Sequence, residues 1–302
     1  MNNNLLALNS LRDLIRWAAS EFNRHNLFFG HGTDNALDEA LALVMHVTAL
    51  DYSVPDHYLD CQLSINEKTQ ILALIQQRIE TRKPLAYLTG EARFANIEFY
   101  VNEHTLVPRS PIAELLMQGY YPWVSEAHSS SFLDLCTGSG CIGIASALYM
   151  PQTQVVISDI STEALAVARR NIQRYDLADQ VTAMESDVFS AIPAQRFDII
   201  VSNPPYVAEA EYQQLPEEYR QEPKLGLTAE HNGMQIVEKI LAGAADYLTD
   251  NGVIIIEVGA SADLLMQRYP QVPFNWIEFE HGGDGVFIFS REELITHQPS
   301  LT

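Results

Sequence analysis

The sequence has 302 residues, 47% of them hydrophobic, which is enough for two domains that each enclose a core. Its 39 acidic and 18 basic residues give a formal net charge of -21, which argues against a nucleic-acid substrate and suits a basic macromolecular partner. The chain opens without a secretory signal pattern, lacks an apolar run long enough for a membrane span, and carries three cysteines without a CxxC pair. We therefore expect a cytoplasmic protein with no membrane attachment and no disulfide framework.

The first ninety residues are predicted to form a small helical domain. Apolar residues recur at helical spacing in three segments, and Asn35 and Ser64 stand where the second and third helices need a cap. Glu67 follows Ser64 by three residues, which is the pattern of a capping box. The apolar positions expected to face the core are Leu8, Leu11, Ile15, Ala18, Phe22, Leu37, Ala40, Leu41, Val44, Ile71, Leu74, Ile75 and Ile79.

A short linker is expected after these helices. Residues 93–107 are rich in aromatic and β-branched types around a polar break, which is typical of a β-hairpin, and Pro108 and Pro111 follow it. We therefore divide the chain into a helical domain over residues 1–90, a hairpin linker over 91–112 and a third region over 113–302.

The third region has the pattern of a doubly wound α/β fold. Apolar runs alternate with segments of helical periodicity, which favours a mostly parallel sheet covered by helices. The predicted strands are residues 131–136, 154–159, 180–185, 197–202 and 253–258. Near the end, two apolar segments flank a glycine-rich turn, so we expect an antiparallel hairpin at the edge of the sheet.

The first predicted strand ends in a glycine-rich turn that is suited to a cofactor. Glycines let a ligand approach the backbone, and the amides of the following helix favour an anionic group. Asp134, four residues before the first glycine, favours a cofactor that also carries positive charge, as S-adenosylmethionine does on its amino group and sulfonium. The turn that is expected to bind it consists of Asp134, Leu135, Cys136, Thr137, Gly138, Ser139 and Gly140.

Two further acids follow the next strands. Asp159 ends the second strand, where a carboxylate can accept both ribose hydroxyls of an adenosine. Asp187 and Val188 follow the third strand, where Asp187 is expected to receive the adenine amino group while Val188 or Phe189 covers the ring. An aspartate after a strand is also common in simple turns.

The most specific signal is the tetrapeptide Asn203-Pro204-Pro205-Tyr206, which directly follows the fourth strand. Consecutive prolines cannot continue a central strand, and they restrict the backbone directions of Asn203 and Pro204. The Asn203 amide oxygen and the Pro204 carbonyl are then two fixed acceptors, suited to the two N–H donors of a planar substrate amide. We predict Asn203, Pro204 and Tyr206 as catalytic residues and all four residues as substrate-binding.

Other candidates are weaker. The nine histidines show no pairing at helical spacing beside an acid, so no metal site is predicted. Cys136 and Cys141 have no evident base beside them and are expected to be small buried residues. Glu257, at the end of the fifth strand, is expected to support the structure or the site residues.

Together, these motifs resemble the protein-(glutamine amide) methyltransferase family. The likeness spans nearly the whole chain and implies a helical substrate-recognition domain before a Rossmann-like class I methyltransferase domain that uses S-adenosylmethionine. It also implies that Cys136 to Gly140, Asp159, Val188 and Asn203 line the cofactor site and that Asn203 to Tyr206 contact the substrate glutamine. Substrates in this family are peptide-chain release factors or a large-subunit ribosomal protein.

Three stretches are similar to the ribosomal branch, whose members methylate large-subunit ribosomal protein 3. They are Phe29 to Asn35, Leu106 to Ile112 and His281 to Phe287. The release-factor branch usually has an Arg-Pro step followed by acids where this chain has Arg109-Ser110-Pro111. One departure lies at Glu230 to Gly233, where the family tends to have a glycine and an aspartate shortly before a second glycine.

Three alternatives remain at this stage. An adenine methyltransferase of nucleic acid would present a similar NH₂ group to Asn203, but the acidic composition and the absence of a basic stripe oppose it. An NAD-dependent oxidoreductase would use Gly138 to Gly143 as its fingerprint and would leave Asp134 and the prolines unexplained. A ribosome-assembly factor without activity would retain only the fold.

Overall fold

The computed structural model describes residues 7–125 and 129–301 of the chain. It divides into two compact units, of which one spans Met1–Glu91 together with Pro216–Gln221. The other spans Ala92–Leu215 and Glu222–Thr302. The chain therefore leaves the second unit for six residues, an excursion that no periodicity in the sequence reveals.

The first unit is built from helices. Its elements are α1 (Leu11–Arg24), α2 (Ala36–Thr48), η2 (Asp56–Asp60), α3 (Ile65–Thr81), α4 (Leu85–Thr89) and η4 (Glu217–Gln221). The predicted caps are confirmed, because Asn35 accepts hydrogen bonds from the first turn of α2 and Ser64 and Glu67 form a capping box on α3. One core position was wrong: Leu37 is 56% exposed, because the buried stripe of α2 runs through Ala36, Ala40 and Leu43 instead.

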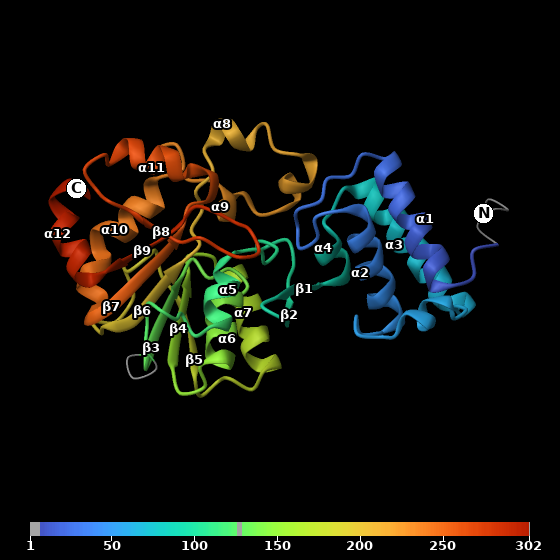
Figure 1. Cartoon of the computed structure of the whole chain (residues 1–302), viewed down its shortest axis with the longest axis horizontal. Helices are drawn as coiled ribbons and strands as arrows, with labels where there is room; N and C mark the ends of the chain where they lie inside the picture. The colour runs from blue at the N-terminus through green and yellow to red at the C-terminus, as the bar shows by residue number, and fades with distance from the viewer. Residues whose placement is uncertain (1–6, 126–128, 302) are drawn as a thin grey trace. The chain divides into compact units, whose positions relative to one another are not determined.

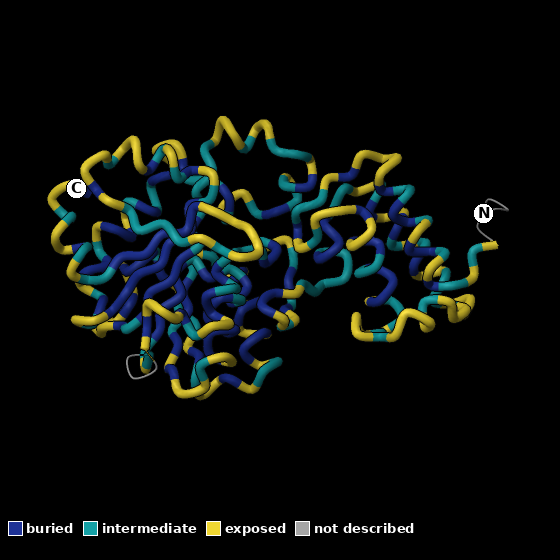
Figure 2. Tube along the Cα trace, viewed as in Figure 1, coloured by how far each residue is buried: buried dark blue, intermediate teal, exposed yellow. Residues whose placement is uncertain are grey.

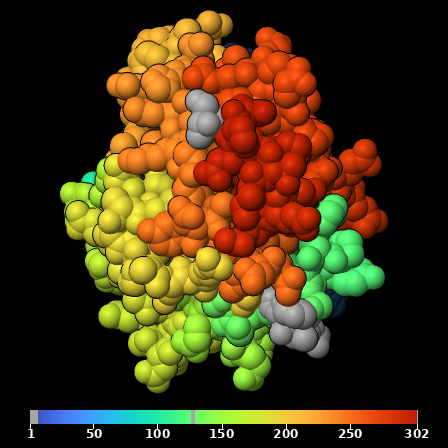
Figure 3. Space-filling model, turned by 90° about the vertical axis from the view of Figure 1, so that its left-hand side faces the viewer, coloured from blue at the N-terminus to red at the C-terminus, as the bar shows by residue number. Residues whose placement is uncertain are grey.

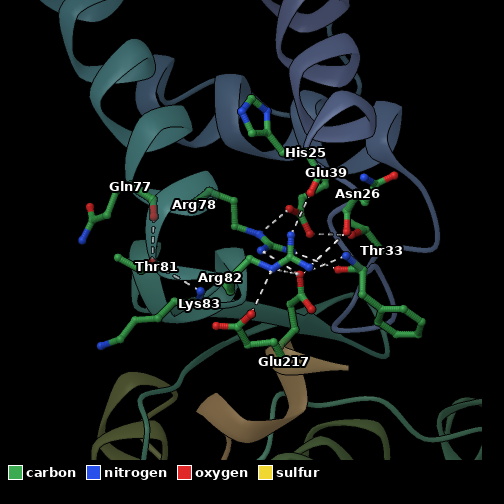
Figure 4. Close-up of polar contacts among 12 residues, drawn as sticks. His25, Asn26, Thr33, Glu39, Gln77, Arg78, Thr81, Arg82, Lys83 and Glu217 are labelled. Atoms are coloured by element: carbon green, nitrogen blue, oxygen red, sulfur yellow. Dashed lines mark hydrogen bonds and ion pairs between the residues drawn. The ribbon is translucent and has the colours of Figure 1, made fainter. Parts of the chain in front are cut away.

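A buried ionic cluster lies inside the helical unit. Arg78 on α3 is fully buried, with its Nε atom 2.7 Å from Glu39 Oε1 and its Nη1 atom 3.6 Å from Glu218 Oε1. Arg82 adds a second guanidinium, 3.1 Å from Glu218 Oε1. Figure 4 shows Arg78, Arg82 and Glu39 converging on one point. Since buried charge is tolerated only when it is paired, the cluster ties η4 to α2 and α3.

The second unit begins with a two-stranded ribbon and continues as a seven-stranded sheet. The ribbon consists of β1 (Glu91–Phe94) and β2 (Ile97–Tyr100), so it begins two residues before the predicted hairpin of residues 93–107 and ends within it. The sheet runs in the order β5-β4-β3-β6-β7-β9-β8. Its strands are β3 (Ser131–Leu135), β4 (Gln154–Asp159), β5 (Val181–Glu185), β6 (Phe197–Ser202), β7 (Leu248–Glu257), β8 (Asn275–Trp276) and β9 (Val286–Ser290).

The direction of the strands confirms the predicted fold class. The first five strands of this order, β5 to β7, pair in parallel, whereas β9 pairs antiparallel with both β7 and β8. β3 lies between β4 and β6, so the order of the strands reverses at β3 and β6. In such sheets, ligands bind beyond the carboxyl ends of the strands at this reversal. The turn after β3 and the Asn203 motif after β6 both lie there.

Helices cover both faces of the sheet (Figure 1). Alternate residues of each strand point to opposite sides, and most residues of β3, β6, β7 and β9 are buried, as the dark strands of Figure 2 show. One core contains side chains of α5 (Ile112–Met117), α6 (Cys141–Tyr149) and α7 (Thr162–Arg174). The other contains side chains of α10 (Gln235–Tyr247), α11 (Ala262–Arg268) and α12 (Arg291–Leu301).

Shorter elements complete the second unit. α8 (Glu209–Tyr212) and α9 (Lys224–Leu227) lie on either side of the excursion, and η5 (Gly259–Ser261) follows β7. The C-terminal α12 packs against α10, and Figure 3 shows it on the surface of this unit. Among residues 7–125 and 129–301, no helix combines the length and apolar character that a membrane crossing requires.

Candidate active site

The glycine-rich turn between β3 and α6 has a backbone that few residues can adopt. Cys136, Gly138 and Gly140 have φ angles of 58°, 58° and 82°. A Cβ atom on Gly138 would meet nothing within 4 Å, whereas one on Gly140 would lie 2.7 Å from Ile144 Cδ1. Gly140 therefore lets α6 pack closely, and Gly138 leaves its backbone open to a ligand. A positive φ at Cys136, which has a side chain, is a strained geometry of the kind found at binding sites.

Asp134 lies beneath this turn. It is 1% exposed, and its Oδ2 atom accepts hydrogen bonds from Thr137 Oγ1 and from the Gly143 amide at 2.9 Å. Its Oδ1 atom is buried, and none of the described residues donates a hydrogen bond to it. Burial raises the pKa of Asp134 to about 7, against the opposing hydrogen bonds. A buried acceptor without a partner suits a donor or a positive charge from a ligand.

Asp159, at the end of β4, holds the turn from the other side. Its Oδ2 atom accepts from the Gly138 amide at 2.9 Å, and its Oδ1 atom accepts from the Ser161 amide at 2.9 Å. Burial raises its pKa, although these backbone hydrogen bonds oppose the shift. Each carboxylate oxygen retains a second acceptor site. Asp159 thus orders the glycine turn and has capacity left for hydroxyl groups.

Asp187 and Val188 follow β5 and line a hollow on the surface. Val188 is buried with a φ angle of 53°, which is rare for a β-branched residue. The Asp187 carboxylate forms an ion pair with Lys239 of α10, a partner that the sequence pattern did not indicate. The hollow has a volume of about 410 Å³ and is lined by Asp187, Val188, Phe189, Ser190, Lys239, Ala242, Gly243 and Tyr247.

The thiol of Cys136 lies within the electrostatic influence of three predicted site residues. Burial raises the pKa of this thiol, and the carboxylates of Asp159, Asp134 and Asp187 raise it further. Burial also raises the pKa of Cys141, to about 12. Both thiols are therefore neutral at physiological pH, which fits small packed residues and not a nucleophile.

The Asn203 motif begins where β6 ends. Ser202 donates a hydrogen bond from Oγ to the Leu135 carbonyl at 2.8 Å, which joins the motif to the end of β3. Asn203 is partly exposed and Pro204 is buried. Within the described chain, no donor is hydrogen-bonded to the Asn203 carboxamide or to the Pro204 carbonyl. The Asn203 carboxamide and the Pro204 carbonyl therefore lie at the end of β6, next to the end of β3 where the glycine-rich turn begins.

The end of the motif is enclosed by residues from distant segments. Ser261 donates a hydrogen bond to the Tyr206 carbonyl at 3.0 Å, and a Cβ atom on Gly233 would lie 2.1 Å from that carbonyl oxygen. The Tyr206 hydroxyl donates to Glu257 Oε1 at 3.4 Å. Gly233 belongs to the stretch Glu230 to Gly233 in which the sequence departs from the family pattern, so that stretch lies directly behind the motif.

Arg109 joins two segments close to this site. It forms a bidentate ion pair with Glu222, with nitrogen–oxygen distances of 2.7 and 2.6 Å, and Glu222 also accepts from the Val107 amide. Sequence reasoning did not select Ser110, Glu222 or Lys239, and it assigned Glu257 only a supporting role. The sequence gives a local signal for Ser110 and for Arg109, because both lie in a stretch that is similar to the ribosomal branch.

Comparison with known proteins places this site in context. Residues 114–218 match the family described as "Methyltransferase small domain". Three relatives are named ribosomal protein uL3 glutamine methyltransferase. That of Francisella tularensis is 42% identical, covering 97% of this chain and 94% of its own. Those of Xanthomonas campestris and Bordetella pertussis are 45% and 43% identical, covering 98% of this chain and 96% and 99% of theirs.

Among solved structures, the hMettl16 catalytic domain is similar over 92% of this chain and 91% of its own. The identity is 15% and the TM-score is 0.49. A likeness this distant says nothing about substrate or chemistry.

Proposed function

The chain belongs to the family of ribosomal protein uL3 glutamine methyltransferases, and we propose that it transfers a methyl group from S-adenosylmethionine to the side-chain amide nitrogen of a glutamine in uL3. The observation that carries the proposal is a pair of acceptors, the Asn203 carboxamide and the Pro204 carbonyl, to which no described residue donates a hydrogen bond. The pair lies beside the glycine-rich turn, at the reversal of the strand order.

The residues at the turn fit S-adenosylmethionine. Asp134 Oδ1 and Ser139 Oγ are buried, and neither atom has a hydrogen-bond partner among the described residues. Gly138 leaves open space above its backbone, and Asp159 retains acceptor capacity. We assign the cofactor to Asp134, Cys136, Thr137, Gly138, Ser139, Gly140, Asp159, Asp187, Val188 and Asn203.

The substrate amide is assigned to the Asn203 motif. When bound, S-adenosylmethionine supplies an activated methyl group on a positively charged sulfur. The Asn203 carboxamide oxygen and the Pro204 carbonyl accept the two N–H groups of the glutamine side chain and hold its nitrogen in one orientation. These acceptors also stabilise the positive charge that develops on the nitrogen as its bond to carbon forms. The Tyr206 ring flanks the amide plane, and the proton leaves to water afterwards.

The substrate assignment agrees with the charge of the chain. An acidic protein with a net charge of -21 attracts a basic ribosomal protein and repels phosphate backbones. We therefore propose that nucleic acid is not the direct substrate, that the enzyme works in the cytoplasm, and that it needs no membrane. Residues 1–90 are proposed to recognise the substrate protein, 91–112 to link, and 113–302 to carry out the transfer.

The test is to incubate the purified enzyme and methyl-labelled S-adenosylmethionine with ribosomal proteins from cells that lack the enzyme. Mass spectrometry then locates the label. We expect methylglutamine in uL3. Label in a peptide-chain release factor would overturn the substrate, label on adenine would overturn the substrate class, and no label on any glutamine would overturn the proposed reaction.

Asn203→Ala tests the role of the motif. We expect kcat to fall by about a hundredfold or more while the Kd for S-adenosylmethionine changes by less than about threefold, because the lost acceptor acts mainly on the amide in the transition state. Calorimetric binding and single-turnover kinetics give the two values. Equal losses in both would contradict the assigned role.

A further inference from the structure

The carboxylate of Glu257 lies between two hydroxyl groups from distant segments. Glu257 is the last residue of β7 and is 5% exposed. Its Oε2 atom accepts a hydrogen bond from Ser110 Oγ at 2.5 Å, and its Oε1 atom accepts from the Tyr206 hydroxyl at 3.4 Å. Ser110 is itself fixed, because its Oγ also accepts from the Ile112 amide at the start of α5. A continuous chain thus runs from α5 through β7 to the Asn203 motif.

This acid is not explained by a salt bridge. The guanidinium of Arg109, whose charge acts on Glu257, is bound on both arms by Glu222. Burial raises the pKa of Glu257 to about 7, although the hydrogen bonds from Ser110 and Tyr206 and the charge of Arg109 oppose it. A buried carboxyl group without a direct cation is costly, so an apolar residue of similar size would serve a purely structural purpose better.

The surrounding backbone leaves the Tyr206 ring little freedom. A Cβ atom on Gly259 would lie 2.9 Å from the Tyr206 hydroxyl oxygen and 3.0 Å from its ring. A Cβ atom on Gly285 would lie 2.1 Å from the Gly259 carbonyl oxygen, and one on Gly283 would lie 2.6 Å from Pro111 Cβ. Three segments therefore pack closely beside the Tyr206 ring: those that contain Ser110, Glu257 and the glycines after His281.

The Tyr206 main chain is fixed separately. Its carbonyl is held by Ser261 and enclosed by Gly233, and Pro204 and Pro205 stiffen the chain before it. The hydrogen bond from the phenol to Glu257 then adds a polar contact that favours one direction of the Tyr206 hydroxyl. Residues next to a reacting group act best when their own rotamers are locked by neighbours.

We propose that Glu257, oriented by Ser110, is a positioning residue for the methyl transfer, because it fixes the Tyr206 phenol and thereby the ring that flanks the substrate amide. The inference rests on the proposed function of the Asn203 motif. It assigns Glu257 no contact with the substrate and no proton transfer.

The test is a double-mutant cycle on methylation of uL3. Tyr206→Phe and Glu257→Leu are each expected to lower kcat by about tenfold, with the KM for S-adenosylmethionine changed less than about twofold, and Ser110→Ala to lower kcat by less. Glu257→Gln, which keeps an acceptor for the phenol, is expected to retain more activity than Glu257→Leu. In the Tyr206→Phe background, Glu257→Leu is expected to have almost no further effect, because its partner is already gone.

Tyr149→Phe is the matched control. Its hydroxyl also donates to one oxygen, the Ala95 carbonyl at 3.0 Å, but Tyr149 is the last residue of α6, at the opposite end of that helix from the glycine-rich turn. We expect it to leave kcat unchanged. If the fall in kcat of the double mutant equals the product of the two single falls, the inference would be overturned, because Glu257 would then act independently of the phenol.

A measurement without activity completes the test. In protein with ¹³C-labelled tyrosine rings, the signal that Tyr206→Phe removes is expected to shift in Glu257→Leu and to stay in place in Tyr149→Phe. An unmoved Tyr206 signal in Glu257→Leu would also overturn the inference. Failure of the proposed function is distinct, because the wild-type enzyme would then leave uL3 unmodified.

Discussion

Buried carboxylates in the two units differ in whether a cation lies beside them. In the helical unit, Glu39 and Glu218 face the guanidinium groups of Arg78 and Arg82. In the methyltransferase unit, Glu222 is paired with Arg109 in the same way, whereas Asp134 and Glu257 are buried with only neutral hydrogen-bond donors in contact. A paired buried acid is costly to separate from its cation, whereas an unpaired acid at the end of a strand retains electrostatic capacity for a ligand or a reacting group.

Arg78→Met is expected to have the largest effect on stability, because it removes a cation from the paired acids of the helical unit. The substitution leaves Glu39 and Glu218 buried with one cation fewer, and breaking a buried pair costs about 3–5 kcal/mol. We expect the helical unit to unfold at lower denaturant, which urea titration followed by hydrogen exchange measures. Arg12→Met is the control, because its pair with Asp60 is exposed, and no measurable change is expected. Equal stability of Arg78→Met and wild type would show that the cluster does not hold the unit together.

The pH dependence of stability isolates the unpaired acid Glu257. In the folded protein the pKa of Glu257 is about 7, above the ordinary 4.5. The protonated carboxyl therefore contributes fully to the free energy of unfolding below about pH 4.5, and this contribution is lost as the pH rises through 7. The difference of about 2.5 pKa units corresponds to at most about 3.4 kcal/mol. We expect Glu257→Gln to flatten the fall in unfolding free energy between pH 5 and 8. Parallel curves for the two proteins would show that Glu257 does not titrate in this range.

Asp134→Asn tests the second unpaired acid. The substitution keeps the shape but removes the charge, so we expect the ligand-free protein to be at least as stable at pH 8 as the wild type. Binding of S-adenosylmethionine should weaken by about tenfold, or ~1.4 kcal/mol, because a positive charge loses its partner. Thermal melting and calorimetry at pH 8 give both quantities. A loss of stability with unchanged affinity would make Asp134 a structural residue.

These contrasts also mark what the sequence could predict. The strands, the helix caps, the glycine turn and the Asn203 motif depend on spacing within a few residues, and local spacing is readable. The ionic cluster and the Ser110–Glu257–Tyr206 chain join residues that are 39 to 147 positions apart. Arg78 reads locally as one more charged residue on a helix, and only packing shows that it is buried. The same holds for Leu37, whose exposure depends on which face α1 covers.

Glu217→Gln is expected to have the smallest effect on the free energy of unfolding, and it allows an exposed and a buried ion pair to be compared within η4. Glu217 and Glu218 are adjacent on η4 and both lie near Arg82, at 3.8 and 3.1 Å. The side chain of Glu217 is 61% exposed and that of Glu218 is fully buried. We therefore expect Glu217→Gln to change the unfolding free energy by less than about 0.5 kcal/mol, and Glu218→Gln to cost about 1–3 kcal/mol. Equal effects in urea titrations would mean that proximity to Arg82, and not burial, sets the strength of these pairs.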